Sequence, residues 1–337
     1  MKKIFCAMLM VTIVCISMSN LNATTINVDK YSEGGLASAI NQTVDGDTIH
    51  VLPGIYNGEN FTNLRIDKKI AIEGSGAVLD GEKKNNIFHI EESGSLTLIN
   101  ITMVNAHGYD GAGIYNEGHN LSIISCKFVN NSANDVGGAI YNSLSDNLKI
   151  INCEFGDNQA RYGAGAIYND GANFTVVNCN FTNNQGSGAG AIYNYYSTGS
   201  FTVLNSNFIN NKGLGSCSCG GAIVNEVSKN MSIDQSTFID NVASFNGGAI
   251  YNYYGDRFKV YNSEFINNRA YNSGSAIYSD LSYYGEIVNT RFSKNSVLPF
   301  DERIDDVGVI FLRGDFYNLE NLTIKDNDPD DIIYDKL

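Results

Sequence analysis

The sequence is poor in positive charge. It has 22 lysine and arginine residues against 36 aspartate and glutamate residues, and its formal net charge is -14. Nucleic acids and anionic membranes are bound by clustered basic side chains. The charge balance therefore argues against both as partners of this chain.

Long apolar runs are also lacking, with one exception near the start. The run over residues 4–16 follows a pair of lysines and precedes LNA, a cleavage motif at residues 21–23, which is the pattern of a secretory signal. This run is too short to span a bilayer. We predict that residues 1–23 are a cleaved signal peptide. The mature chain is then secreted or lies at the cell surface, without a transmembrane segment.

Helical patterns are missing from the repeated part of the chain. Its apolar runs are only four to six residues long, as in AIYN, LKIIN and FTVVN. Helical repeats need apolar residues at positions i, i+3 and i+4 over longer segments. The runs are rich in isoleucine, valine, phenylalanine and tyrosine, and glycine, asparagine, aspartate or serine bounds them, which predicts short β-strands.

One unit of about 27 residues recurs through most of the chain, and a period in this range is typical of stacked repeats. Its pattern is GGAIYN, an apolar run, N-C-x-F and an asparagine pair. The isoleucine of the first block recurs at spacings of 26, 27, 25, 31, 27 and 27 residues, at Ile114, Ile140, Ile167, Ile192, Ile223, Ile250 and Ile277. The phenylalanine of the second block recurs at Phe128, Phe155, Phe181, Phe208, Phe238, Phe265 and Phe292.

Three short strands and three turns fit into one such unit. A single unit cannot bury its own apolar face, so it must stack on its neighbours. We therefore predict an all-β fold, a right-handed parallel β-helix of roughly nine coils, because parallel crossovers are strongly right-handed. The phenylalanines are expected to form one interior column, and Ile87 extends the isoleucine positions upstream, 27 residues before Ile114.

The predicted repeats span residues 91–327. Residues 24–90 are expected to form an N-terminal cap and the first strands, with a short helix that has Leu36, Ala39 and Ile40 on one face. Such a cap covers the end of a solenoid, where exposed core and unpaired edges favour association. Residues 328–337 are predicted to be an acidic C-terminal tail, because the glycine and glutamate of a calcium loop are missing.

Asparagine recurs at three fixed positions of the unit. One set precedes the phenylalanine by three residues and contains Asn152, Asn178, Asn205, Asn262 and Asn289. Two further sets follow the phenylalanine by three residues and the isoleucine by two. Asparagine tolerates left-handed backbone and hydrogen-bonds nearby peptide groups. We predict that it lines the corners of the coils, where stacked amides bond to one another.

The same motifs resemble known β-helix families. GDTIHVLPGIY followed by KKIAIEGSG resembles the entry into pectin-lyase-like right-handed β-helices. The GGAIYN and NCxFxNN blocks resemble the repeats of chlamydial polymorphic outer-membrane proteins and of adhesin-like surface proteins of methanogenic archaea. The resemblance to the archaeal group covers nearly the whole mature chain, and it implies an adhesin-like role at the cell surface.

Three cysteines share one position of the unit. Cys126, Cys153 and Cys179 lie in successive units, and later units have serine or threonine there, so the position requires a small side chain. We expect free thiols, although neighbours one coil apart could form one disulfide. No histidine accompanies them, which argues against a metal site. Cys217 and Cys219 lie in a glycine-rich insertion, where a mobile loop, a local disulfide or a metal contact stays open.

A polysaccharide lyase or glycoside hydrolase is one alternative function, since enzymes on the resembled fold cut acidic polysaccharides. The hydrolase motifs are missing, and the carboxylates of the repeats occupy different positions in the unit. His89, His107 and His119 share no position with one another, so we expect turn or surface histidines. Glycoside chemistry needs two carboxylates at a set separation. We therefore expect no catalytic residues, no metal and no cofactor.

Tyrosine directly follows the isoleucine of the GGAIYN block in most units, at Tyr115, Tyr141, Tyr168, Tyr193, Tyr251 and Tyr278. Side chains alternate along a strand, so these tyrosines point outward if the isoleucines point inward. The stripe either stabilises the stack by aromatic pairing or binds a ligand. Tyr195, Tyr196, Tyr253 and Tyr254 extend it at the following turn.

These patterns favour a non-catalytic, adhesin-like binding module. We expect the four turn tyrosines to contact glycans or cell-surface proteins, because tyrosine joins an apolar ring to a polar hydroxyl. A structural spacer in a larger envelope protein is the other alternative.

Overall fold

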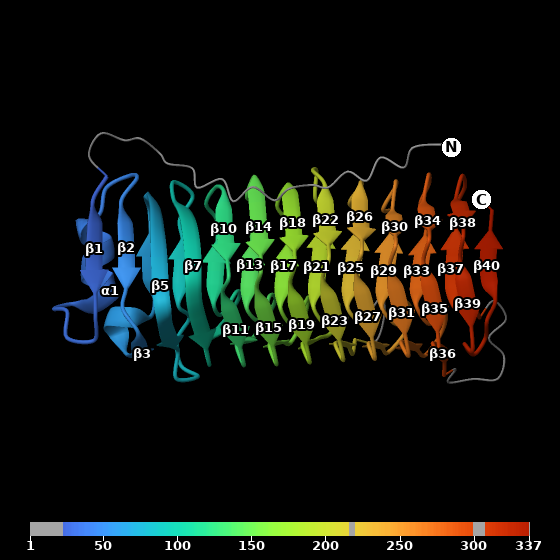
Figure 1. The fold of residues 1–337 in the computed structure, drawn as a ribbon, viewed down its shortest axis with the longest axis horizontal. Coiled ribbons are helices and arrows are strands. Elements are labelled where there is room, and N and C mark those ends of the chain that lie inside the picture. Colours follow the sequence, from blue (N-terminus) through green and yellow to red (C-terminus); the bar gives the residue numbers. More distant parts are fainter. Residues whose placement is uncertain (1–22, 216–219, 299–306, 337) are drawn as a thin grey trace, which may run out of the picture.

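The repeat units stack into a rod, in which successive coils add strands to parallel arrays (Figure 1). The computed structural model describes residues 23–215, 220–298 and 307–336. The predicted signal peptide, except for Ala23, lies outside these residues, as do Cys217 and Cys219. The strands are parallel, and Ile140 pairs with Ile167 of the next unit. The predicted parallel β-helix is therefore confirmed.

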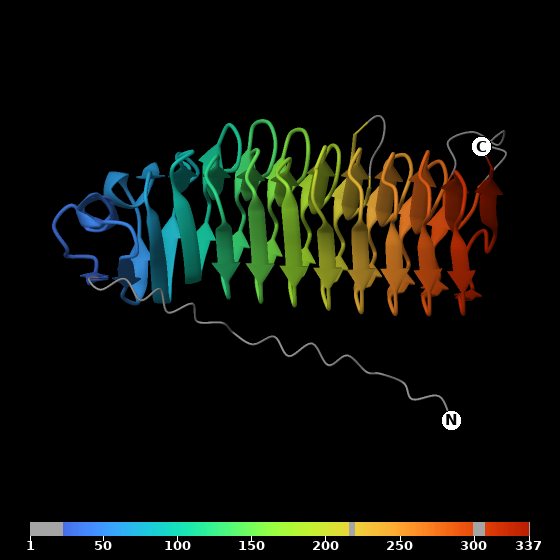
Figure 2. The same ribbon diagram turned by 90° about the horizontal axis from the view of Figure 1, so that it is seen from above.

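Three sheets enclose the core, and the connecting loops lie in a row along one edge of the rod (Figure 2). Sheet B has 11 strands: β4 (Leu64–Ile66), β6 (Phe88–Ile90), β9 (Ile114–Asn116), β13 (Ile140–Asn142), β17 (Ile167–Asn169), β21 (Ile192–Tyr195), β25 (Ile223–Glu226), β29 (Ile250–Tyr253), β33 (Ile277–Asp280), β37 (Ile310–Arg313) and β40 (Ile332–Asp335). Sheet C has eight short strands: β8 (His107–Gly108), β12 (Ser132–Ala133), β16 (Gln159–Ala160), β20 (Gln185–Gly186), β24 (Lys212–Gly213), β28 (Val242–Ala243), β32 (Arg269–Ala270) and β36 (Ser296–Val297).

Sheet A has 21 strands and bends, so most coils contribute two strands to it. Its first half contains β1 (Thr25–Val28), β2 (Thr48–Val51), β5 (Lys69–Asp80), β7 (Ser95–Val104), β10 (Leu121–Ile124), β14 (Asn147–Ile151), β18 (Asn173–Val177), β22 (Phe201–Leu204), β26 (Met231–Asp234), β30 (Lys259–Tyr261), β34 (Glu286–Val288) and β38 (Asn318–Glu320). Strands β5 and β7 continue into its second half, with β3 (Gly54–Tyr56), β11 (Lys127–Val129), β15 (Glu154–Gly156), β19 (Asn180–Thr182), β23 (Asn207–Ile209), β27 (Thr237–Ile239), β31 (Glu264–Ile266), β35 (Arg291–Ser293) and β39 (Thr323–Lys325).

The predicted phenylalanine column is confirmed. The side chains from Phe128 to Phe292 are all buried, and each ring stacks on the next with centroids 4.7–5.0 Å apart. This spacing is that of paired strands, so the column follows directly from the in-register stacking of the coils.

The predicted asparagine corner is confirmed as well. Asn152, Asn178 and Asn205 all have φ between 47° and 55°, in the left-handed region, and their amides bond from coil to coil at 3.1 and 2.8 Å. Gln235 interrupts the column, and Asn262 instead donates to Asp234 at 2.8 Å, while Asn289 donates to Asn262 at 3.3 Å.

The asparagines that follow the phenylalanines lie inside the rod rather than on its surface. Asn158 and Asn184 are fully buried, and the Nδ2 of Asn158 donates to the Oδ1 of Asn184 and to the carbonyl of Phe128, both at 2.9 Å. The backbone N–H of Asn158 donates to the same Oδ1 at 3.1 Å. Each amide therefore satisfies buried groups of its neighbours, as a low-dielectric interior requires.

The shared cysteine position is explained by a similar contact. The backbone N–H of Cys153 donates to the sulfur of Cys179 at 3.4 Å, and that of Cys179 donates to the hydroxyl of Ser206 at 3.1 Å. A small side chain with an acceptor atom is therefore needed there. The three thiols are free and buried, and burial raises the pKa of Cys126 to about 12.

The two ends of the rod differ in part from expectation. The helix α1 (Gly35–Gln42) buries Leu36, Ala39 and Ile40 against the first coils, beside the 3-10 turn η1 (Glu59–Phe61), as the cap prediction requires. The segment predicted to be a tail contains β40, which pairs in parallel with β37, so that prediction is wrong for residues 332–335. Ile332 of β40 is partly buried and packs against the core, which outweighs the acidic character of the flanking residues.

The number of coils and one N-terminal position also need correction. Sheet B has 11 strands, more than the nine coils expected, because both ends of the chain continue the stack. Phe88, not Ile87, pairs with Ile114. Both side chains are fully buried, so apolar character alone does not distinguish them. Among the described residues, no helix is both long and apolar enough to cross a membrane.

Candidate functional site

The four turn tyrosines form two similar pairs on one edge of sheet B. Tyr195 ends β21 and Tyr196 follows it, and their rings meet edge to face at 4.6 Å. Tyr253 ends β29 and Tyr254 follows it, with the rings at 4.5 Å. Tyr196 and Tyr254 expose 58% and 48% of their surface. The structure therefore brings the predicted residues to one edge, two coils apart.

The backbone at these turns is unusual. Tyr196 and Tyr254 have φ of 47° and 51°, and Leu144, Val227 and Leu281 have φ of 51–52° at the same turn. This left-handed region suits glycine and asparagine, and a bulky or β-branched residue there is an outlier. Such strain persists only where the surrounding structure enforces it, and it gathers at functional sites.

These five residues form one line along the rod, which we name the corner row: Leu144, Tyr196, Val227, Tyr254 and Leu281. The N–H of Tyr196 donates to the carbonyl of Glu226 at 3.0 Å, and that of Val227 donates to the carbonyl of Tyr253 at 2.8 Å. Leu144 is 83% exposed. In the coil between Leu144 and Tyr196, Gly171 holds the corresponding position. Three members of the corner row, Leu144, Tyr196 and Tyr254, are thus exposed, and Val227 and Leu281 are half-buried.

Sequence reasoning missed the three aliphatic members of the corner row. Each of them is the fourth residue after the isoleucine of the GGAIYN block, so the sequence already shows that they share one position of the unit. A second exposed feature was also missed on the same side. Tyr284 and Phe316 stack with centroids 5.0 Å apart, at the turns that follow β33 and β37. Exposed apolar side chains thus continue toward the C-terminal end.

The tyrosines directly after the isoleucines are not a free surface. Tyr251 is only 5% exposed, and Tyr193 and Tyr278 pack with it in a small apolar cluster outside the main core. The rings of Tyr251 and Tyr278 stack at 5.4 Å. Burial raises the pKa of Tyr141 to about 12. This column chiefly stabilises the stack, which was one of the two expected roles.

Carboxylates on sheet B are bound by these tyrosines or by arginine. The hydroxyl of Tyr115 donates to Glu117 at 3.1 Å, that of Tyr141 donates to Asp170 at 3.1 Å, and that of Tyr193 donates to Glu226. Further along, Arg313 donates two hydrogen bonds to Asp280 at 2.5 and 2.6 Å. Each of these carboxylates therefore has a structural partner.

One mixed donor set lies near the N-terminal end of sheet B. His89, Glu91 and Glu117 place their donor atoms within 4.8 Å of one another. The Nε2 of His89 is 2.7 Å from Glu117, whose pKa this contact lowers, and Arg65 forms an ion pair with Glu91. Such donors could hold a metal ion, but here a guanidinium already neutralises one of them. His89 was expected to lie in a turn or on the surface, whereas it lies half-buried in β6, in register with Tyr115.

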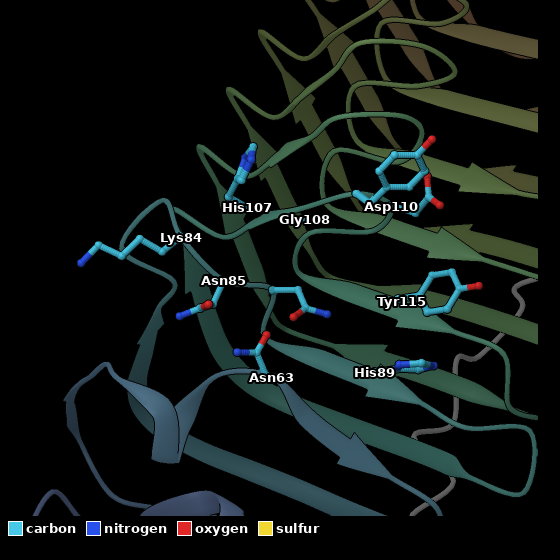
Figure 3. A pocket seen from close by; sticks show the side chains of 10 residues that line it. Asn63, Lys84, Asn85, His89, His107, Gly108, Asp110 and Tyr115 are labelled. Carbon is cyan, nitrogen blue, oxygen red and sulfur yellow. The ribbon is translucent and has the colours of Figure 1, made fainter.

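A hollow of about 360 Å³ adjoins this set (Figure 3). It lies between the turn at Asn85, the loop at Asp110 and the strand residues His89 and Tyr115 (Figure 3). Burial raises the pKa of Asp110, which accepts a hydrogen bond from the N–H of Val136 at 3.1 Å. Asp110 is the only carboxylate that lines the hollow in the described part of the chain, so this hollow lacks a carboxylate pair.

Comparison with known proteins supports the repeat assignment. A family model for the Chlamydia polymorphic membrane protein repeat matches residues 125–143, 235–253 and 262–280. Each matched stretch runs from the asparagine corner position to the end of a sheet B strand, or to one residue beyond it in the case of 125–143. A comparison with curated proteins gave no match. The chain is thus a β-helix repeat protein with three repeats that match the polymorphic membrane protein model.

Two solved lyase structures align with the chain. The PL6 family alginate lyase AlyGC aligns with a TM-score of 0.46 and 13% identity, over 94% of this chain and 40% of its own length. The pectate lyase Pel9A aligns with a TM-score of 0.47 and 13% identity, over 80% of this chain and 78% of its own. The chain therefore spans less than half the length of the alginate lyase.

Proposed function

We propose that this β-helix is a secreted or cell-surface, adhesin-like protein that binds glycans or protein partners without catalysis. The observation that carries the proposal is the corner row, where Leu144, Tyr196 and Tyr254 are exposed in left-handed backbone. Residues with no function at such positions are expected to be mostly asparagine or glycine, as most residues of the asparagine corner are.

The corner row suits a binding surface for physical reasons. A solenoid presents one position of its repeat as a line, so contacts add along the rod. Tyr196 and Tyr254 each offer a flat ring and a hydroxyl, and each is braced by the ring of the preceding tyrosine. Aromatic side chains that are already held in place lose little conformational freedom on binding. A neutral glycan or a protein fits best, because the chain carries a net charge of -14.

The non-catalytic part of the proposal rests on the carboxylates. Glu117, Asp170, Glu226 and Asp280 are each held by a tyrosine, histidine or arginine side chain. Catalysis of glycoside cleavage would require two carboxylates placed on either side of a bond. We therefore expect no release of reducing ends or unsaturated products from pectin, polygalacturonate or alginate, with or without calcium. Either product from pure protein would favour the alternative of an enzyme.

The test of the binding surface is a set of matched tyrosine variants. Tyr195, Tyr196, Tyr253 and Tyr254 are changed together to serine, and attachment to cells and to immobilised glycans is compared with the unchanged chain. The control changes Tyr31 and Tyr162, which are also exposed but lie away from the corner row, to serine.

We expect lost attachment for the fourfold variant, normal attachment for the control, and similar melting temperatures for both. Full attachment by a folded fourfold variant would contradict the proposal. It would leave the spacer in an envelope protein as the better account.

A further inference from the structure

A second hollow lies on sheet C, on a different face from the corner row. It has a volume of about 420 Å³, and its floor carries Gln159 and Gln185. Ser132, Asn134 and His107 lie toward one end, and Arg161 lies at the side. Small-molecule sites have volumes of about 300–1,000 Å³ and a few placed polar groups. The size and lining of this hollow fit that description.

The shape of the hollow follows from the sequence of sheet C. Its strands are only two residues long, and the second residue is small in every strand along the hollow, as in Ala133, Ala160 and Gly186. Gln159 and Gln185 are the first residues of their strands and are exposed, so their side chains stand above a low floor. Leu214 adds an exposed apolar side chain to the lining.

The glutamine amides of this hollow differ from the other stacked amides of the rod. Gln159 and Gln185 are directly opposite in neighbouring strands, yet neither side chain makes a hydrogen bond within the described residues. By contrast, the stacked pairs Asn158–Asn184 and Asn152–Asn178 are bonded at 2.9 and 3.1 Å. The two glutamines thus keep all their donors and acceptors available.

We propose that this hollow binds a segment of an oligosaccharide. A primary amide offers a donor and an acceptor side by side, and neighbouring hydroxyls of a sugar ring satisfy both. Two such amides on adjacent coils contact successive parts of one chain. The lining contains no carboxylate in the described part of the molecule, although the chain has 36 acidic residues, so hydroxyl-rich ligands meet no fixed negative charge there.

Charged and uncharged sugars share this hydroxyl chemistry. Arg161, whose guanidinium lies 5.2 Å from the ring centre of Tyr162, is the cation that would distinguish an acidic sugar from a neutral one. A glycan is favoured over a peptide, because the hollow offers open amides and no unpaired strand edge. Both sheet C strands at its centre, β16 and β20, are paired on each side.

The site is independent of the corner row, and the experiment separates the two. Neutral hexasaccharides of glucose and xylose, and an oligogalacturonate of similar length, are titrated into the full chain by calorimetry. The same titrations are made with Gln159→Leu/Gln185→Leu, and with a control, Lys149→Leu/Thr175→Leu, which alters the same two coils on sheet A.

We expect one of these sugars to bind, at least tenfold weaker binding by the glutamine variant, and unchanged binding by the control. The fourfold tyrosine variant should also bind the sugar normally. If the leucine variant is unstable, Gln159→Ala/Gln185→Ala serves instead. Chemical shifts of the two glutamine amides in the unchanged chain give a second readout, and they should move on addition of the sugar.

Three results would overturn this proposal. They are the absence of binding by every sugar, equal binding by the glutamine variants, and shifts of the glutamine amides with an extended peptide but with no sugar.

Discussion

The ring of Phe155 lies flat on the ring of Phe181, with centroids 4.8 Å apart and planes inclined by only 4°. Phe181 in turn stacks on Phe208 at 4.8 Å and 1°. This contact shows how one repeated residue becomes a continuous core. Each ring fills the space between its two neighbours, so no coil is stable by itself.

Removal of one ring from this column should be costly. Phe181→Ala leaves a cavity between two rings that cannot close it, because both are held by their strands, and we expect a loss of about 3–5 kcal/mol in the free energy of unfolding. The control is Lys149→Ala, at an exposed position of β14, which should change stability by less than about 0.5 kcal/mol. Urea denaturation measures both, and similar losses for the two variants would contradict the stacked column.

The buried and the surface asparagines should respond differently to substitution. Asn184→Ala leaves the N–H and the side-chain amide of Asn158 without their acceptor in a buried place, so we expect a loss of at least about 2 kcal/mol. Asn178→Gly keeps a left-handed corner and removes only exposed contacts, so its effect should be within about 1 kcal/mol. If Asn178→Gly lowered stability as much as Asn184→Ala, the column of buried asparagines would not be what satisfies the buried amide groups of Asn158.

The left-handed backbone of the corner row should lower the free energy of unfolding of the chain. Leu144 is exposed and has φ of 52°, a region that costs an ordinary residue about 1–2 kcal/mol. Leu144→Asn should therefore raise the free energy of unfolding by about 1 kcal/mol, since asparagine tolerates this conformation. The control, Leu214→Asn, changes an exposed leucine outside the left-handed region and should bring no such gain. A destabilised Leu144→Asn variant would argue against strain at this corner.

Glu286 should make stability depend on pH. Hydrogen bonds from Lys259 at 2.7 Å and from Tyr261 at 2.5 Å lower its pKa below the ordinary value of 4.5. A lowered carboxyl pKa stabilises the fold above the unfolded-state value, and this contribution disappears as the pH falls through the folded-state value. The stability difference between the unchanged chain and Glu286→Gln should thus shrink as the pH falls below about 4.5.

The control for this pH dependence is Glu264→Gln, in the neighbouring strand β31. The side chain of Glu264 makes no hydrogen bond or ion pair within the described residues, so its substitution should leave the pH profile unchanged. Chemical denaturation at several pH values compares the three proteins. Equal profiles for Glu286→Gln and the unchanged chain would refute the assignment.

The regular part of this structure could be predicted because it is repeated. Phe155 and Asn178 recur in register, and each repetition tests the same assignment again. The ends were less predictable, since the stack there is built from different residues. Phe88 and Ile87 are both buried, so the one-residue difference in register leaves no sign in the sequence.

The candidate sites were harder to predict for two physical reasons. The corner row mixes leucine, valine and tyrosine, and left-handed backbone at such residues follows from the stacking of the coils and not from their own preferences. The hollow on sheet C depends on strands of two residues, such as Gln159–Ala160, which are too short to show a period of two. Both candidate sites therefore depend on neighbours that only the assembled rod provides.

Protection of individual tyrosines tests the proposed contact surface most directly. Oxidation by hydroxyl radicals is measured for each exposed tyrosine by mass spectrometry, with and without the bound cell-surface partner or glycan. Tyr196 and Tyr254 should become protected on binding, whereas Tyr31 and Tyr162, which are exposed elsewhere, should react as before. Undiminished oxidation of Tyr196 and Tyr254 in the bound state would contradict the role of the corner row.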